Sequence, residues 1–335
     1  MKAKFLNLYI LFFCILSITA IDVSTVEELH TALAKAKAGQ IISIAPGEYD
    51  YSTYERKKSF LLRASGASSR PITLTAQDPE NPPVLLGPDI SRDGVLEIRG
   101  DYWVIENIKI ANSGQGIILD NANNNTFSNI EIYSVGSLAV YLRANSSYNL
   151  FQNCYIHGTG NADDNYGYGL FIESPILQDG KIVTKSDYNV IKGCVFRYIV
   201  SDPIVFRNCT KGNEVVKSVF YGDGINGKKR VRSFMRIEGD ENYIHDNVIY
   251  RNSNRNIDAA FKVVKSETSG DGNIFANNVL FMDRPDSEVE DRRIFVVDGP
   301  DASISVKNNK IDYGDGLVDA DKEEFYNSDS VTFLK

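Results

Sequence analysis

One pattern of polar and apolar residues recurs along most of the chain, between Trp103 and Ile311. Each copy is a four-residue phrase that ends in Ile, Leu or Phe, and the copies begin at Asn107, Asn129, Asn153, Gly193, Lys217, Asp246, Asn277 and Asn308. The gaps between successive starts are 22, 24, 40, 24, 29, 31 and 31 residues. A basal unit of 22–24 residues with occasional longer loops is typical of a solenoid.

Each unit also contains a second short segment in which inward and outward positions alternate. These segments are Ala139–Arg143, Leu170–Glu173, Ile204–Arg207, Met235–Glu238 and Phe261–Val264. They are rich in β-branched and aromatic residues, too short for helices, and bounded by Gly, Asn, Asp and Ser, which predicts strands. We therefore predict an all-β parallel β-helix, in which each coil buries its apolar face only by stacking on its neighbours.

Asparagines mark equivalent places in successive units. One set stands four residues ahead of most phrases: Asn125, Asn149, Asn189, Asn213, Asn242 and Asn273. Asn247, Asn278 and Asn309 share a second slot, which we expect to point inward. Buried amides that repeat at one coil spacing predict a ladder whose hydrogen bonds satisfy the turn backbone.

The two ends of the chain differ from this repeat. Residues 1–20 combine two lysines, an apolar run and a small-residue end, which predicts a signal peptide and a secreted, extracellular protein. Residues 21–335 are then one β-helix domain, expected to be a monomer. Residues 24–38 begin with the capping box Ser24-x-x-Glu27 and predict a helix that covers the open end of the solenoid. Residues 312–335 predict a short closing segment.

Charge and length exclude several classes of partner. The chain carries a formal charge of −8, so we expect no nucleic-acid partner. No stretch after the predicted signal approaches the ~20 apolar residues of a membrane span. A polyanionic substrate would therefore need a local basic patch or a bridging cation.

Cysteines and glycosylation motifs add two open questions. Cys154 and Cys194 occupy the same slot of consecutive units, so a disulfide and a pair of buried thiols are both compatible with the repeat. Asn124, Asn145 and Asn208 begin acceptor triplets for N-glycosylation. Asn-rich turns also generate such triplets by chance.

The outward positions of the second segments carry the candidate chemistry. Aligning these segments by their inward residues predicts one outward column of Arg143, Glu173, Arg207, Glu238 and Val264. A second column contains Tyr141, Phe171, Val205, Arg236 and Lys262. Such a strip is either a solvated ladder of opposite charges or a groove that holds a negatively charged sugar chain.

Two long loops are expected near this strip. The loop 158–169 carries Asp163 and Asp164, candidate ligands for Ca²⁺, and Tyr166 and Tyr168, candidate sugar-stacking rings. Asp, Asn and Gly are also turn formers. The loop 223–232 carries Lys228, Lys229 and Arg230, the strongest basic patch of the chain and a candidate polymer contact.

The N-terminal region carries a resemblance to a known superfamily. Val23–Leu29, Ala38–Tyr49 and Arg70–Leu74 resemble the opening of pectin-lyase-like proteins, closest in pattern to the alginate lyase and chondroitinase B polysaccharide lyases. The resemblance covers nearly all of the chain after residue 20. It implies a single-stranded right-handed parallel β-helix and is more specific for the fold than for the activity.

The resemblance also implies a set of site residues. Asp202–Cys209 resembles the family strand in which an acidic Ca²⁺ ligand precedes a catalytic lysine. Asp202 then matches the ligand and Arg207 the base, so the chain departs from the family by having arginine in place of lysine. The next coil of the family brings an arginine, whose place Arg236 or Glu238 would take.

Together these features predict a protein that binds a uronate-containing polysaccharide and cleaves it by β-elimination. That reaction requires a neutralised carboxylate and a base near the α proton. Arg207 is the predicted base, Arg236 and Lys262 are carboxylate or acid partners, and Glu173, Glu238 and Asp202 are orienting groups or cation ligands. The alternatives are a polygalacturonase-type hydrolase, which needs paired acids on the groove floor, and a non-catalytic carbohydrate-binding protein.

Overall fold

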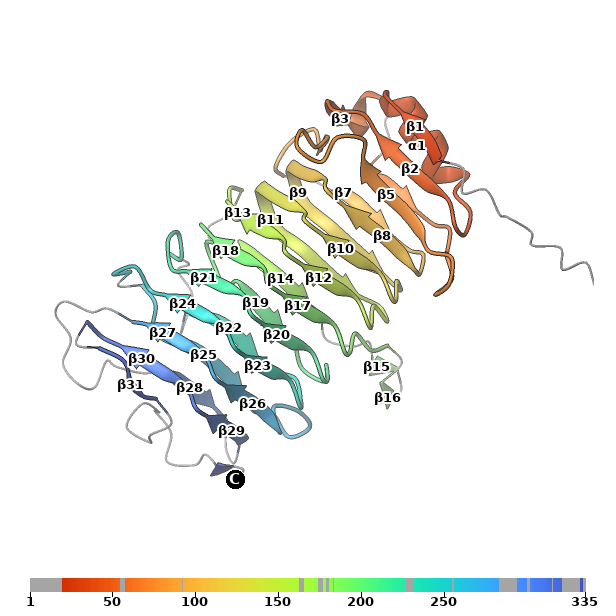
Figure 1. Ribbon diagram of the computed structural model, residues 1–335. Coiled ribbons are helices and arrows are strands. Elements are labelled where there is room, and N and C mark those ends of the chain that lie inside the picture. Colours follow the sequence, from red (N-terminus) through yellow and green to blue (C-terminus); the bar gives the residue numbers. More distant parts are fainter. Residues whose placement is uncertain are drawn as a thin grey trace, which may run out of the picture.

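The chain forms an elongated stack of coils (Figure 1). The computed structural model describes residues 20–54, 58–91, 93–162, 166–173, 177–178, 181–182, 184–226, 232–254, 256–282, 294–299, 302–314, 316–320 and 332–333. Equivalent strands of successive coils pair in parallel along three faces, which we name sheets 1, 2 and 3. The predicted parallel β-helix is therefore confirmed.

Sheet 1 contains twelve parallel strands among the described residues. In spatial order they are β1 (Ala20–Val23), β2 (Ile41–Ile44), β5 (Ile72–Ala76), β8 (Trp103–Glu106), β10 (Thr126–Ser128), β12 (Leu150–Gln152), β17 (Val190–Lys192), β20 (Glu214–Val216), β23 (Tyr243–His245), β26 (Asn273–Ala276), β29 (Ser303–Lys307) and β32 (Thr332–Phe333).

Sheets 2 and 3 share two long strands, β9 (Lys109–Asp120) and β11 (Glu131–Arg143), which turn the corner between them. The other strands of sheet 2 are β3 (Glu48–Asp50), β6 (Val84–Leu86), β13 (Tyr155–His157), β18 (Val195–Arg197), β21 (Val219–Tyr221), β24 (Val248–Tyr250), β27 (Val279–Phe281) and β30 (Lys310–Asp312). Those of sheet 3 are β4 (Phe60–Leu62), β7 (Gly94–Ile98), β14 (Tyr168–Ile172), β19 (Ile204–Phe206), β22 (Ser233–Ile237), β25 (Ala259–Val264) and β28 (Phe295–Asp298).

Few elements lie outside the coils. The single-turn helix η1 (Tyr51–Thr53) follows β3, and the hairpin β15 (Leu177–Gln178) and β16 (Lys181–Ile182) projects from one coil. Near the C-terminus β31 (Val318–Asp319) pairs antiparallel with β30, and β32 extends sheet 1. Within the part of the chain that the structure describes, no helix has the length and apolar character to cross a membrane.

Backbone geometry explains the repeated phrase. All eight starting residues have left-handed backbone, with φ between 51° and 63°. Asn and Gly enter this region more readily than other residues do, and five of the eight starts are Asn. The phrase therefore marks the turn between sheets 1 and 2, and its apolar fourth residue begins the next buried wall.

Two asparagine ladders form, one from the asparagines ahead of the phrases and one, predicted from the sequence, from Asn247, Asn278 and Asn309. In the first, each backbone N–H from Asn125 to Asn242 donates to the side-chain oxygen of the equivalent asparagine one coil on, at 2.9–3.0 Å. In the second, the N–H groups of Asn247 and Asn278 donate to the next amide at 3.1 and 3.0 Å. Every member is buried, so the ladders supply hydrogen bonds where water does not reach.

The N-terminal helix is shorter than expected. Helix α1 spans Val26–Ala34 and packs over the end of the stack, as predicted for a cap. Its capping box uses Thr25 and Glu28 in place of Ser24 and Glu27, because Thr25 has the extended backbone of an N-cap residue. Residues 1–19 of the predicted signal peptide lie outside the described residues.

Cys154 and Cys194 are free and buried. Their mutual hydrogen bonding and burial raise the pKa of the Cys154 thiol well above its ordinary value. The Sγ atoms also lie 3.5 Å from the carbonyl oxygens of Gln152 and Phe151, respectively. The structure thus contains two thiols at this position.

Candidate active site

The strand register confirms the two outward columns. Tyr141, Phe171, Val205, Arg236 and Lys262 pair in sequence across β11, β14, β19, β22 and β25. The inward residues Leu142, Ile172, Phe206, Ile237 and Val263 are fully buried. Arg207, Arg236 and Lys262 therefore lie on the same face, sheet 3.

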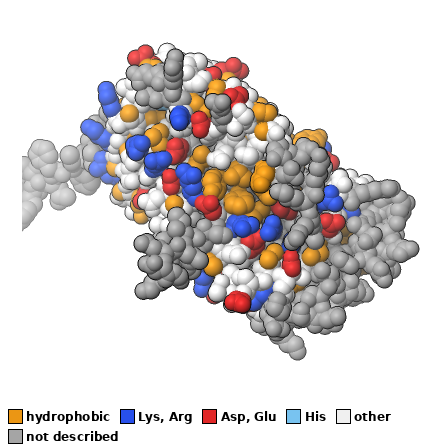
Figure 2. Space-filling model, turned by 180° about the vertical axis from the view of Figure 1, so that it is seen from behind, with side chains coloured by type: hydrophobic (Ala, Val, Ile, Leu, Met, Phe, Trp, Pro, Cys, Tyr) orange, Lys and Arg blue, Asp and Glu red, His pale blue; other side chains and the backbone are white. Residues whose placement is uncertain are grey.

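A groove of about 710 Å³ lies over sheet 3. Figure 2, which views the molecule from behind, shows a hydrophobic area bordered by Lys, Arg, Asp and Glu side chains. The residues that line the groove are Ile90, Ser91, Gly114, Gln115, Gly136, Ser137, Leu138, Tyr141, Ala162, Tyr166, Tyr168, Phe171, Glu173 and Arg207. Four of the predicted site residues, Tyr166, Tyr168, Glu173 and Arg207, are among them.

The tyrosines of the groove differ in environment. Burial and a hydrogen bond to the Glu173 carboxylate raise the pKa of Tyr141. Burial also raises the pKa of Tyr168, and the nearby charges of Arg236 and Arg207 oppose that effect. Tyr166 is half exposed at the mouth of the groove. Tyr168 is thus a protonated hydroxyl at neutral pH, close to two cations.

Glu238 links the two arginines. Its carboxylate is 3% exposed and accepts from Arg207 Nη1 at 3.3 Å, and it lies 2.5 Å from Arg236 Nη2. Both guanidinium groups remain about one-third exposed. A buried carboxylate shared by two cations leaves positive charge toward the solvent while fixing the direction of both side chains.

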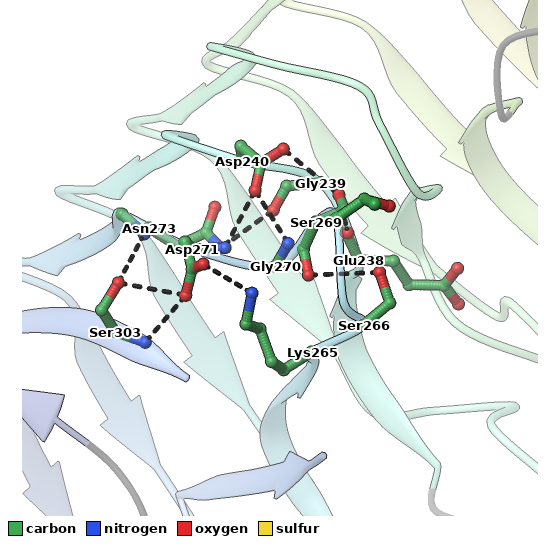
Figure 3. A network of polar contacts seen from close by, with 12 residues as sticks. Glu238, Gly239, Asp240, Lys265, Ser266, Ser269, Gly270, Asp271, Asn273 and Ser303 are labelled. Atoms are coloured by element: carbon green, nitrogen blue, oxygen red, sulfur yellow. Dashed lines mark hydrogen bonds and ion pairs between the residues drawn. The ribbon is translucent and has the colours of Figure 1, made fainter. Parts of the chain in front are cut away.

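A polar network supports the backbone that carries Glu238 (Figure 3). Ser269 Oγ donates to the Glu238 carbonyl oxygen at 2.7 Å, and the Asp240 carboxylate accepts from the N–H groups of Gly270 and Asp271. Asp271 in turn accepts from Lys265 Nζ at 2.6 Å. These bonds tie the loop after β25 to the end of β22, so Glu238 sits on a braced turn.

Lys262 pairs with Arg236 on the next strand, and Asp202 lies two residues before β19. Lys262 is 7% exposed, with Nζ 3.5 Å from Asp298 Oδ2. Asp202 is buried and accepts from the backbone N–H and the hydroxyl of Ser233 at 3.1 and 3.0 Å. Burial raises the pKa of Asp202 to about 6, although the Ser233 hydrogen bonds and the charges of Arg236 and Lys262 oppose the shift.

Asp202 is not surrounded by a set of calcium ligands among the described residues. Among the described residues, no group of three or more His, Cys, Asp or Glu side chains is arranged to hold a metal. The Asp202 carboxylate is directed to Ser233, whereas Ca²⁺ takes six to eight oxygen ligands. Asp163 and Asp164 lie outside the described residues. Calcium binding stays a prediction, and the proposed mechanism does not use a calcium ion.

The remaining predicted residues lie elsewhere or outside the described ranges. Arg143 is in the expected column but pairs with Asp120 at 3.2 Å, beside the groove lining. Lys228, Lys229 and Arg230 are outside the described residues. Asn124 is exposed, whereas Asn145 and Asn208 are half-buried and the side-chain oxygen of Asn145 accepts from the Lys185 N–H at 2.7 Å. Glycosylation stays untested.

Sequence reasoning missed part of the groove. Tyr141 and Phe171 belong to the predicted column, and the structure shows that they also line the groove. Gln115 and Ser137 come from β9 and β11, which continue from sheet 2 into sheet 3. Their alternation passes through a register irregularity between Val135 and Leu138, which hides the outward positions.

The comparisons with known proteins identify the family and the fold. The model of the Pel9A-like right-handed β-helix region matches residues 19–242. The chain belongs to this family. The match confirms the right-handed coil and the superfamily that the N-terminal segments resemble. A search of curated proteins returned no match.

Solved structures of polysaccharide lyases are similar to this family member. An alginate lyase from Paenibacillus sp. str. FPU-7 is 31% identical, with a TM-score of 0.82 over 93% of this chain and 98% of that one. A rhamnogalacturonan lyase is 15% identical, with a TM-score of 0.56 over 90% and 80%. Pectate lyase Pel9A is 18% identical, with a TM-score of 0.50 over 83% and 72%. The fold is thus one that polysaccharide lyases use, which supports the prediction of an enzyme.

Proposed function

We propose that this protein is an exported lyase that cleaves a uronate-containing polysaccharide by β-elimination. The observation that carries the proposal is the pair Arg207 and Arg236, held by one buried carboxylate at the end of an aromatic groove. An acidic sugar chain offers the carboxylates that these cations would bind. The similarity to an alginate lyase makes alginate the first substrate to test.

The arginines supply charge neutralisation. Removing the proton α to a carboxylate places negative charge on the carboxylate oxygens, and fixed cations stabilise that charge. Arginine stays protonated in proteins, and Arg207 donates to Glu238. We therefore assign Arg207 and Arg236 to the carboxylate, in place of the base role that the sequence suggested for Arg207.

Two other residues of the groove, Glu173 and Tyr168, transfer the protons. Glu173 is the carboxylate that lines the groove among the described residues, and it is hydrogen-bonded to Tyr141. It accepts the α proton, the electron pair of the broken C–H bond forms the new C=C bond, and the C–O bond to the leaving sugar breaks. Tyr168, protonated and close to both arginines, gives a proton to the leaving oxygen.

A substrate panel tests the proposal. The protein without residues 1–20 is incubated with alginate, polygalacturonate and chondroitin sulfate, with and without Ca²⁺. The proposal predicts products whose new double bond absorbs in the ultraviolet, and no cleavage of polymer whose carboxylates have been reduced to alcohols. Binding to all three polymers without cleavage would support the non-catalytic alternative.

Single substitutions separate the roles. Arg207→Ala and Arg236→Ala should each lower kcat/KM about 100-fold or more, the size expected for losing one charge-stabilising donor, and Arg207→Lys should restore part of that loss. Glu173→Gln and Tyr168→Phe should each lower kcat with little change in KM. Full activity in Glu173→Gln would contradict the assignment of Glu173 as the base.

A further inference from the structure

A second hollow lies at the N-terminal end of sheet 3. It has a volume of about 590 Å³ and is formed by α1, the turn after η1, and strands β4 and β7. Four cationic residues line it: Lys35, Lys58, Arg63 and Arg99. We name this cavity, which these four residues line, the basic hollow.

The charge of the basic hollow is largely uncompensated. Glu97 is the one acidic residue that lines it within the described part of the chain. It pairs with Arg99 at 2.6 Å, and Arg99 also lies 3.7 Å from Asp120, which is outside the lining. Neither Lys58 nor Arg63 pairs with a described carboxylate, and both are exposed. Four cations and one anion leave a formal charge of 4 − 1 = +3 in the lining, in a chain of −8. The positive charge of the lining is opposite to the negative net charge of the chain. Such a local positive charge favours the binding of a polyanion.

The basic hollow and the groove lie along one sheet. Leu61, Glu97, Ile118, Tyr141 and Phe171 pair in register from the hollow to the groove. In the adjacent column, Arg63 and Arg99 are followed by Asp120, Arg143, Glu173 and Arg207. Five coil steps of about 4.8 Å place the backbones of Arg63 and Arg207 roughly 24 Å apart.

Figure 2 shows where cationic side chains gather on this face. Lys and Arg side chains gather between the N-terminal end of the molecule and the central hydrophobic area. Two of the four cations have structural explanations: Lys35 follows the last residue of α1, where a cation stabilises the helix terminus, and Arg99 is ion-paired with Glu97. No such explanation applies to Lys58, which precedes β4, or to Arg63, which follows it directly.

We infer that the basic hollow is a distal binding subsite for the acidic polysaccharide, several sugars from the bond that is cleaved. This inference rests on the proposed function and adds a second point of attachment to it. A long polymer contacts the arginines of the groove and the basic hollow together, whereas a short oligosaccharide reaches the groove alone. Binding at the hollow then raises the affinity for polymer without contacting the reacting atoms.

The test is the double variant Lys58→Ala/Arg63→Ala, compared with Lys192→Ala/Lys307→Ala. The control removes two exposed cations from sheet 1 and so matches the loss of charge. The inference predicts that KM for long polymer rises about fivefold in the first variant, as for two exposed ionic contacts, while kcat and the KM for a trisaccharide do not change. The control variant should behave as the wild type.

A direct binding measurement keeps this test independent of catalysis. Affinity electrophoresis in gels that contain polyuronate should show weaker retardation of the Lys58→Ala/Arg63→Ala variant than of the control, at low salt. Equal retardation and equal polymer KM in the two variants would overturn the distal subsite. Weaker retardation of the Lys58→Ala/Arg63→Ala variant than of the control, with no unsaturated product from the wild type, would instead overturn the proposed lyase activity and leave the subsite supported.

Discussion

Glu238 controls the direction of two cations. Its carboxylate lies in contact with both Arg207 and Arg236, and its backbone is braced by Ser269. A column of outward charges would ordinarily be exposed, but the two guanidinium groups cover this carboxylate and leave it 3% exposed. The side chain therefore acts on the substrate through the arginines and positions them.

Replacing Glu238 by Gln tests that positioning. The amide keeps the shape but loses the charge that attracts both guanidinium groups. Charge-assisted hydrogen bonds contribute about 1.5–3 kcal/mol each, so we expect kcat/KM to fall about 10- to 100-fold. The control is Glu131→Gln, which breaks a similar contact with Lys109 on sheet 2 and should leave activity unchanged. Equal kinetics of Glu238→Gln and wild type would contradict the role.

Asp202 makes stability depend on pH. Burial raises its pKa from 3.8 to about 6, so the folded chain retains the proton in a range where the unfolded chain has lost it. The contribution of protonated Asp202 to the free energy of unfolding is therefore fully present below about pH 4 and is lost as pH rises through 6. Asp202→Asn keeps an acceptor for Ser233 and removes the titration. Its unfolding free energy relative to wild type should increase by about 2–3 kcal/mol between pH 4 and 7.

Urea unfolding at several pH values measures this difference. The exposed carboxylate of Asp22 on β1 provides the control, as Asp22→Asn. A wild-type curve that gains stability relative to Asp202→Asn across the same range would contradict the assignment.

At the scale of single elements, the strands depend on the ladders between them. Asn278 accepts from the N–H and amide of Asn247 and donates to Ile244 and Asn309. Asn278→Ala removes these bonds and leaves buried partners unpaired, which costs about 1–3 kcal/mol for each unsatisfied group. We expect an unfolding free energy lower by at least that amount.

The matched control for this substitution is Asn153→Gly. Asn153 has left-handed backbone, and the equivalent position one coil on is Gly193. Glycine adopts this conformation without strain, so we expect a change below about 0.5 kcal/mol by urea denaturation. A loss in Asn278→Ala no larger than in the control would show that the ladder does not stabilise the coil.

At the scale of the whole molecule, the sequence predicts which residues are neighbours wherever the repeat determines the stacking of the coils. Once the coil period is known, Arg236 and Lys262 must be neighbours, because equivalent slots stack at one strand spacing. The groove was less predictable, because β9 and β11 pass around a corner without a break and bring Gln115 and Ser137 to the site. The burial of Glu238 was hidden as well, since it depends on side chains from two other positions.

The capping box shows a similar limit at the N-terminus. Ser24-x-x-Glu27 and Thr25-x-x-Glu28 both satisfy the sequence pattern. The structure uses the second, in which Thr25 has the extended backbone of an N-cap residue and its side chain accepts from the Glu28 N–H. The local pattern thus places the N-cap of this helix to within a residue, whereas the helix ends at Ala34 and not at the expected residue 38.

The source of the oxygen in the product tests the central claim most directly. β-Elimination breaks the C–O bond without water, whereas hydrolysis adds a water oxygen to the new end. Cleavage of alginate or another polyuronate in ¹⁸O-labelled water, followed by mass spectrometry of the fresh products, distinguishes the two. The account predicts unsaturated products without ¹⁸O from the cleavage step, and saturated products that carry ¹⁸O would contradict it.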